Sequence, residues 1–177
     1  VRNMAGGRRV ETIVAPSDTR PDTAVRQARK LIEQDQVDFI IGPLSGSEGI
    51  AMRDYAKTIP NKTVINGISG ALETTWVDPA PNFFRYNLDG AQWGAGLGTY
   101  VARTKGWRRV ASVSADYSFG YTNFCRSGGN IVQRFWVPLG ATDFGGVIAQ
   151  LPDNVDAIYL GLGGTDAINF LNQWQQA

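Results

Sequence analysis

Short apolar runs alternate along this chain with longer stretches in which the apolar residues have helical spacing. Within Pro21–Gln34 the apolar residues recur at i, i+1, i+4, i+7 and i+8, which places them on one face of a helix. Pro21 suits the first turn, because the N–H group there would have no intrahelical partner. Val37–Ile41 follows as a mostly apolar run that stops at Gly42-Pro43. The pattern predicts a helix followed by a buried strand.

The same alternation continues to the end of the chain. Runs with strand character are Val10–Val14, Lys62–Ile65, Phe83–Tyr86, Val110–Ser114, Ile131–Val137 and Ala157–Leu160. Stretches with helical character are Glu48–Thr58, Ala91–Thr104, Asp143–Leu151 and Thr165–Gln176. Within Ala91–Thr104, the glycines at 94, 96 and 98 indicate close helix packing. Strands separated by helices predict an α/β fold with mostly parallel sheets.

The alternation breaks between Gly67 and Asn82, where three turns rich in proline and glycine replace a helix. Such an interval is either a loop over one sheet or a passage between two lobes, and we favour the passage, with the crossing near Tyr86–Gly90. We therefore assign residues 1–86 to part of a first lobe and residues 87–177 to part of a second. Val1–Gly7 has the character of a helix end, and the last residues stop within a helix. We expect both lobes to be incomplete.

Composition narrows the function. Of the 177 residues, 43% are hydrophobic, which is ample for a core, and the net charge of +1 gives no electrostatic case for binding nucleic acid or an anionic membrane. No apolar run approaches the ~18 residues of a membrane span, so we expect no direct membrane insertion. Histidine is absent, which removes a Ser-His-Asp triad and most zinc sites. The spacing of Asp116 and Asp166 supports no hydrolase, so we expect no enzyme, metal or cofactor.

Four segments follow predicted strands, at the edge where open α/β sheets bind ligands. In the first, Ser45, Gly46 and Ser47 open a predicted helix, whose exposed amides favour a carboxylate. The alternative is that Ser45 or Ser47 only caps the helix, and the sequence leaves both interpretations open. The second segment, Asn66–Ala71, has glycines that let backbone amides approach a ligand. Taken singly, it is more typical of an ordinary turn.

The third segment contains Tyr117 and Phe119, which either offer flat apolar surface to a ligand or pack on the sheet, the more common role of aromatic residues. The fourth begins at Gly161 and contains Gly163 and Gly164. It lacks the last glycine of a dinucleotide-binding turn, because Asp166 stands there. Trp93, near the start of a predicted helix, either lines a cleft between lobes or is buried.

Several strings, in order along almost the whole chain, resemble one known family. They are Gly6–Glu11, Ala24–Leu31, Val37–Ser45, Pro81–Arg85, Gly140–Phe144 and Pro152–Tyr159. They resemble the type I periplasmic binding fold, within the branched-chain amino-acid (Leu/Ile/Val-binding) family of solute-binding proteins of ABC transporters. The resemblance implies two doubly wound parallel-sheet lobes with the ligand in a cleft between them.

The resemblance also implies a ligand site built from the strand-end loops. Combined with the aromatic residues noted above, the expected ligand contacts are Ser45, Gly46, Ser47, Asn66, Ser69, Gly70, Ala71, Trp93, Tyr117, Phe119, Gly163 and Gly164. Where the family often carries an aromatic residue, this chain carries Gly163-Gly164. The smaller residues leave room for a larger ligand, such as an aromatic acid.

The function implied is that of a non-enzymatic solute-binding protein in the periplasm or otherwise outside the cytoplasm. It would capture a small carboxylate-bearing ligand, either an amino acid or an aromatic acid, and deliver it to the membrane permease of an ABC transporter. The alternative is a ligand-sensing domain of a receptor or transcription regulator with the same fold.

Overall fold

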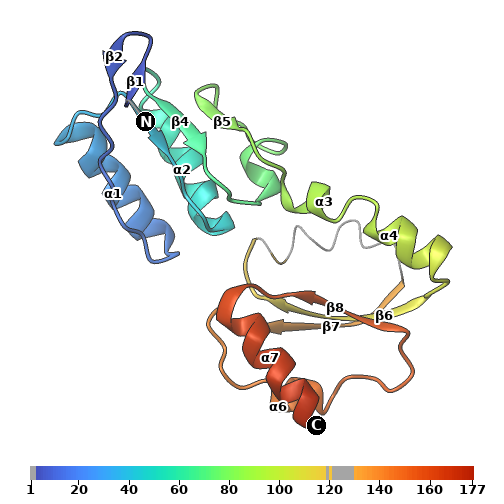
Figure 1. The fold of residues 1–177 in the computed structure, drawn as a ribbon. Helices are drawn as coiled ribbons and strands as arrows, with labels where there is room; N and C mark the ends of the chain where they lie inside the picture. The colour runs from blue at the N-terminus through green and yellow to red at the C-terminus, as the bar shows by residue number, and fades with distance from the viewer. Residues whose placement is uncertain (1–2, 119, 121–129) are drawn as a thin grey trace.

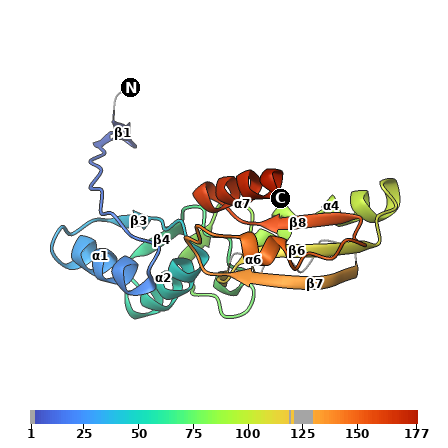
Figure 2. The ribbon, with the colours of Figure 1, turned by 90° about the horizontal axis from the view of Figure 1, so that it is seen from below.

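A computed structural model describes residues 3–118, 120 and 130–177, which form two parallel three-stranded sheets and a small hairpin. The first sheet has the order β3-β4-β5 and the second the order β7-β6-β8. Figures 1 and 2 show the two sheets at opposite ends of the molecule, with helices packed along each. The α/β class with parallel sheets is confirmed. The division of the chain into lobes at residues 86 and 87 stays a prediction.

The N-terminal region differs from what its pattern predicts. Met4–Ala5 (β1) and Arg8–Arg9 (β2) form an antiparallel hairpin, not a helix end. Gly6 and Gly7 form its turn with φ of 55° and 78°, and two consecutive positive φ angles are what a tight hairpin turn requires. Val10–Val14 is also not a strand, because no neighbouring strand in the described chain pairs with it. Val14 is 84% exposed, and Figure 2 shows this region projecting from the rest.

The first sheet is built from β3 (Phe39–Ile41), β4 (Thr63–Asn66) and β5 (Phe83–Arg85). Two helices, α1 (Pro21–Glu33) and α2 (Gly46–Thr58), pack against each other beside it. The apolar face predicted for α1 contributes Ala24 and Ala28 to the core, and Pro21 occupies the first turn as expected. The core also contains Ile40, Met52, Tyr55, Ala56, Val64, Ala80 and Phe83.

The interval 67–82 is a loop over this one sheet. It leaves β4, passes through the short helix η1 (Leu72–Thr74) and returns to β5, which pairs with β4 in parallel. Arg53 of α2, which is buried, donates hydrogen bonds to the carbonyl oxygens of Glu73 and Asp78 at 2.8 and 2.7 Å and so holds the loop against the helix. The favoured interpretation of this interval as a passage between lobes is therefore wrong.

The segment after β5 is less regular than its pattern predicts. The helix expected over Ala91–Thr104 is divided into α3 (Gly90–Trp93), α4 (Leu97–Thr99) and the π-helix η2 (Tyr100–Thr104). Gly96 has φ of 88°, which a continuous right-handed helix does not permit. The glycines at this point end one helix and begin another, in addition to any role in packing.

The second sheet has β6 (Arg109–Ala115) at its centre, with β7 (Asn130–Val137) on one side and β8 (Ala157–Gly161) on the other. The helices α6 (Gly145–Ile148) and α7 (Gly164–Gln176) pack against each other beside it. Phe144 and Phe170 meet edge to face at 5.5 Å between ring centroids in its core. The chain leaves β6 for β7 and then crosses to β8, so the direction of strand addition reverses at β6.

Candidate functional site

The first predicted segment forms the start of α2. Ser45 is the N-cap residue and is buried, and its backbone N–H donates to Glu48 Oε2 at 3.1 Å. The N–H groups of the first residues of a helix have no intrahelical acceptor, so Gly46 and Ser47 present backbone donors at the positive end of the helix. Ser45 and Glu48 form a capping box, with the Ser45 side chain directed at the Glu48 N–H, so Ser45 does cap the helix. The groups of this segment that can bind an anion are mainly the backbone N–H groups of Gly46 and Ser47.

The second segment is folded around the amide of Asn66, which is fully buried at the end of β4. Its Nδ2 donates to the Ser69 carbonyl oxygen at 2.9 Å, and its Oδ1 accepts from the Ser69 N–H at 3.2 Å. Both ends of the amide therefore hold the loop. Asn66 was expected to contact the ligand, and the structure gives its side chain this supporting role.

Ser69 packs against α2, and its side chain is fully buried. A Cβ atom built at Gly49 would lie 2.0 Å from Ser69 Oγ, so the helix and the loop touch at a position where only glycine fits. Gly70 and Ala71 are buried as well, and the Gly70 carbonyl oxygen accepts from the Gly90 N–H at 2.9 Å. The loop after β4 is thus held on two sides.

Arg85, at the end of β5, holds the same loop. Its Nη1 donates to the carbonyl oxygen of Ser69, and its Nη2 donates to the carbonyl oxygen of Ala71 at 2.8 Å and to the hydroxyl of Thr74. Burial lowers the pKa of the Arg85 guanidinium, and the negative charge of Asp89 opposes that shift. Sequence reasoning missed Arg85, which lies inside the predicted strand Phe83–Tyr86 and whose partners give no signal in the sequence.

The second sheet contributes the loops after β6 and β8. A ligand crevice is expected where strand order reverses, which here is the carboxyl end of β6. β6 and β8 are paired neighbours, with Ser114 opposite Gly161, so Tyr117 and the Gly163-Gly164 turn follow adjacent strand ends. Tyr117 is half-buried, and desolvation together with the charge of Asp166 raises the pKa of its phenol.

Gly163 and Gly164 are exposed at the start of α7, and a Cβ atom at either would meet nothing within 4 Å. Both positions therefore border open space, and their role as ligand contacts stays a prediction. Asp166, in the first turn of α7, accepts a hydrogen bond from the Gly140 N–H at 2.8 Å. Its carboxylate thus braces α7 against the segment after β7.

The loops of the two sheets meet at one point. Ser47 Oγ on α2 lies 3.4 Å from Ser118 Oγ, which follows β6. Ser118 was not among the expected ligand residues, although it directly follows Tyr117 in the same segment. The contact brings the first and third predicted segments together.

Two of the expected ligand residues, Trp93 and Phe119, are not among the loop residues described above. Trp93, at the end of α3, is 39% exposed and lies in the segment between the two sheets. Phe119 lies outside the described residues.

Among the described residues no group of three or more acidic or cysteine side chains is placed to hold a metal ion. In the same part of the chain, no helix has the length and apolar character needed to cross a membrane.

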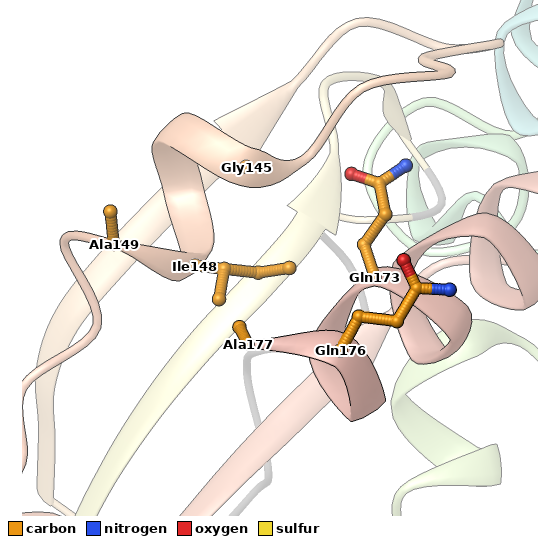
Figure 3. Close-up of a pocket in the computed structure, with 6 residues that line it drawn as sticks. All are labelled: Gly145, Ile148, Ala149, Gln173, Gln176 and Ala177. Carbon is orange, nitrogen blue, oxygen red and sulfur yellow. The ribbon is translucent and has the colours of Figure 1, made fainter.

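A pocket elsewhere contains none of the predicted ligand residues. Figure 3 shows it between α6 and the end of α7, lined by Gly145, Ile148, Ala149, Gln173, Gln176 and Ala177. The side-chain amide of Gln173 already has hydrogen-bond partners: its Oε1 accepts from the Phe144 N–H and its Nε2 donates to the Thr142 carbonyl oxygen. The strand-end loops therefore remain the candidate site.

Comparisons with known proteins find solved structures with a similar fold. An ABC transporter substrate-binding protein from Sphaerobacter thermophilus is 31% identical, with 97% of this chain and 49% of that chain covered and a TM-score of 0.81. A solute-binding protein of an ABC transporter from Rhodopseudomonas palustris BisB5, in complex with 3,4-dihydroxybenzoic acid, is 26% identical, with coverage of 97% and 49% and a TM-score of 0.81.

A branched-chain amino acid transporter substrate-binding protein from Streptococcus pneumoniae, in complex with isoleucine, shares the fold at 19% identity. The TM-score is 0.80, with 96% of this chain and 50% of that chain covered. The chain thus spans about half the length of these solved relatives. A comparison with curated proteins gives no match.

These likenesses confirm the type I periplasmic binding fold, although they include proteins in complex with either an aromatic acid or an amino acid, so the subfamily stays a prediction. A family model described as periplasmic binding protein matches residues 2–177. The chain belongs to the periplasmic binding protein family.

Proposed function

We propose that this protein captures a small carboxylate-bearing molecule between the strand-end loops of its two sheets. The observation that carries the proposal is the meeting of the α2 start with the loop after β6, where Ser47 and Ser118 lie 3.4 Å apart. The backbone donors at the start of α2 supply a favourable place for the carboxylate. The half-buried ring of Tyr117 supplies apolar surface on the other side.

Within that class we propose an aromatic acid as the ligand. Gly163 and Gly164 have no atom within 4 Å of their Cβ positions, which leaves room beside the loop that carries Tyr117. A flat ring fills such a space with favourable offset or edge-to-face contacts to an aromatic side chain. The complex of the 26% identical relative with 3,4-dihydroxybenzoic acid supports this choice.

The cellular role that we propose is delivery of this ligand to the membrane permease of an ABC transporter, outside the cytoplasm. The family and the transporter proteins among its relatives support this role. We propose that the protein binds this ligand without converting it, as a binding protein does. A ligand-sensing domain of a receptor or regulator is the alternative, and the relatives do not favour it.

Isothermal titration calorimetry of the full chain tests the proposal. The probes are benzoate, 4-hydroxybenzoate, 3,4-dihydroxybenzoate, leucine, isoleucine and valine, with benzamide as the uncharged match to benzoate. We expect the aromatic acids to bind and benzamide to bind at least about tenfold more weakly, because it lacks the carboxylate charge. A preference for leucine or valine would contradict the choice of ligand. Equal affinity for benzamide and benzoate, or no binding of any probe, would contradict the site.

A further inference from the structure

In the segment 66–74 after β4, two carbonyl oxygens and one hydroxyl group accept hydrogen bonds from the guanidinium of Arg85. Arg85 donates to the carbonyl oxygens of Ser69 and Ala71 and to the hydroxyl of Thr74. Ser69 and Ala71 are fully buried, and so is Thr74. The three acceptors therefore have little access to water. Asn66 Nδ2 donates to the Ser69 carbonyl oxygen and the Thr74 hydroxyl donates to the Ala71 carbonyl oxygen, so Arg85 supplies a second donor to each.

The same arginine lies close to the segment that leaves the first sheet. Burial lowers the pKa of Arg85, whereas the charge of Asp89, which is buried, raises it, and Asp89 also caps α3 by accepting from the Gln92 N–H at 2.8 Å. The next residue, Gly90, donates its N–H to the Gly70 carbonyl oxygen. Loop 66–74, β5 and the start of α3 are thus joined through one group of charged and backbone contacts.

We infer that Arg85 is a positioning residue for ligand binding: it fixes loop 66–74 in the conformation that presents its backbone to the ligand. This inference rests on the proposed function, because it assigns the loop to that same site. Arg85 itself does not contact the ligand. Its planar guanidinium carries five N–H donors on three nitrogens, and Nη1 and Nη2 together reach the three acceptors, whereas a lysine carries all its donors on one nitrogen.

A matched control is available in the same chain. Arg53 is buried, whereas Arg85 is half-buried, and it also donates to two carbonyl oxygens, but those belong to Glu73 and Asp78, toward the far end of the segment. The variants Arg85→Gln and Arg53→Gln therefore remove the same charge and hydrogen bonds to two carbonyl oxygens each, and Arg53→Gln also removes ion pairs with Asp54 and Asp78. Only Arg85→Gln removes a donor to the Ser69 and Ala71 carbonyl oxygens.

The experiment measures two properties of the full chain and both variants: amide hydrogen exchange across residues 67–74, and the affinity for 3,4-dihydroxybenzoate. We expect Arg85→Gln to speed exchange at Ser69–Ala71 and to weaken binding by about tenfold or more, as loss of charged hydrogen bonds to the loop implies. Arg85→Lys is expected to recover part of the affinity. Arg53→Gln is expected to leave the affinity of the folded protein within about twofold.

Unchanged exchange at Ser69–Ala71 in Arg85→Gln would overturn the inference. Faster exchange with unchanged affinity would also overturn it, because the loop would then be loosened without consequence for the ligand. Equal losses of affinity in both arginine variants would point to general destabilisation and overturn it as well. If the wild-type chain binds none of the aromatic acids, the proposed function fails, and the exchange comparison still decides whether Arg85 holds the loop.

Discussion

The hydroxyl oxygens of Ser47 and Ser118 lie 3.4 Å apart, although the two residues belong to loops of different sheets and are 71 positions apart in the chain. Ser47 is in the first turn of α2, and Ser118 follows β6. The contact provides a direct measure of whether the two loops are together in solution.

A pair of cysteines at these positions is expected to form a disulfide. Disulfide formation needs Cβ atoms about 3.5–4.5 Å apart, and side chains already in contact require only small adjustment. The variant Ser47→Cys with Ser118→Cys, in a Cys125→Ser background, should lose both free thiols on mild oxidation. Thiol titration and gel mobility measure the product. The two single-cysteine variants are the controls, and thiols that persist in the double variant would show that the loops stay apart.

Filling the space at the start of α7 is expected to weaken ligand binding. Gly163 has an ordinary extended conformation, with φ of −129°, and open space around its Cβ position. Gly163→Trp should therefore fold but occupy the room proposed for an aromatic ring, and reduce the affinity for 3,4-dihydroxybenzoate by at least about tenfold. Calorimetry checks this, with Gly163→Ser as the small control that also suits a helix N-cap. Full affinity in the tryptophan variant would place the ligand elsewhere.

The neighbouring glycine is expected to matter for stability instead. Gly164 has φ of 55°, a left-handed conformation that costs an L-residue about 1–2 kcal/mol. Gly164→Ala should lower the free energy of unfolding in urea by about that amount, although its Cβ atom would meet no neighbour. Gly163→Ser is the comparison and should change stability little. An equal effect of the two substitutions would contradict the conformational explanation.

The contact between α2 and the loop after β4 predicts a strong coupling between two positions. In Gly49→Ala the new Cβ atom would lie 2.0 Å from Ser69 Oγ and 2.9 Å from Ser69 Cβ, so the loop has to shift. Such overpacking costs about 1–3 kcal/mol. Adding Ser69→Gly removes both atoms and should restore part of the lost stability. Urea unfolding of both single variants and the double variant measures the coupling, and simple additivity would show that the two residues do not touch.

One carboxylate should make stability depend on pH. Asp156 Oδ2 accepts from the backbone N–H groups of Arg109 and Arg108, at 2.9 and 2.7 Å, and these bonds lower its pKa in the folded state. A carboxyl group whose pKa is lower when folded stabilises the protein above its unfolded pKa of about 3.9, and this contribution is lost as pH falls through the folded pKa.

Asp156→Asn should therefore reduce stability at pH 7 and flatten its decline in acid. Urea unfolding at a series of pH values from 7 to below 4 measures both effects. Asp153→Asn, three positions away, is the charge-matched control. If both variants keep the acid dependence of the wild type, the bonds to Asp156 do not contribute it.

The elements with strong local patterns could be predicted from the sequence. α1 has both a clear apolar face and a proline at its first turn, and β6 combines Val110, Ala111 and Val113 with small serines, so each appears where expected. Gly6-Gly7 was ambiguous, because the same residues end helices and form tight hairpin turns. The choice between these depends on whether a partner strand follows.

The positions of the strand-end loops were predictable from the sequence, but the contacts that their side chains make were less so. Strand ends locate the loops, whereas the direction of each side chain depends on contacts between segments distant in the sequence. Asn66 and Ser69 were expected to face a ligand, and their side chains are buried in the loop and against α2. Arg85 escaped notice because its partners are carbonyl oxygens, which leave no pattern in a sequence.

The close approach of Gly49 to Ser69 separates the site into a fixed half and an adaptable half. On the first sheet, α2 and the loop after β4 interlock so tightly that neither accepts extra atoms without moving the other. On the second sheet, the turn at Gly163 is bordered by open space. An engineer who wants this scaffold to report a different molecule, for example as a fluorescent sensor, should therefore build the new selectivity at the start of α7 and leave the α2 side untouched.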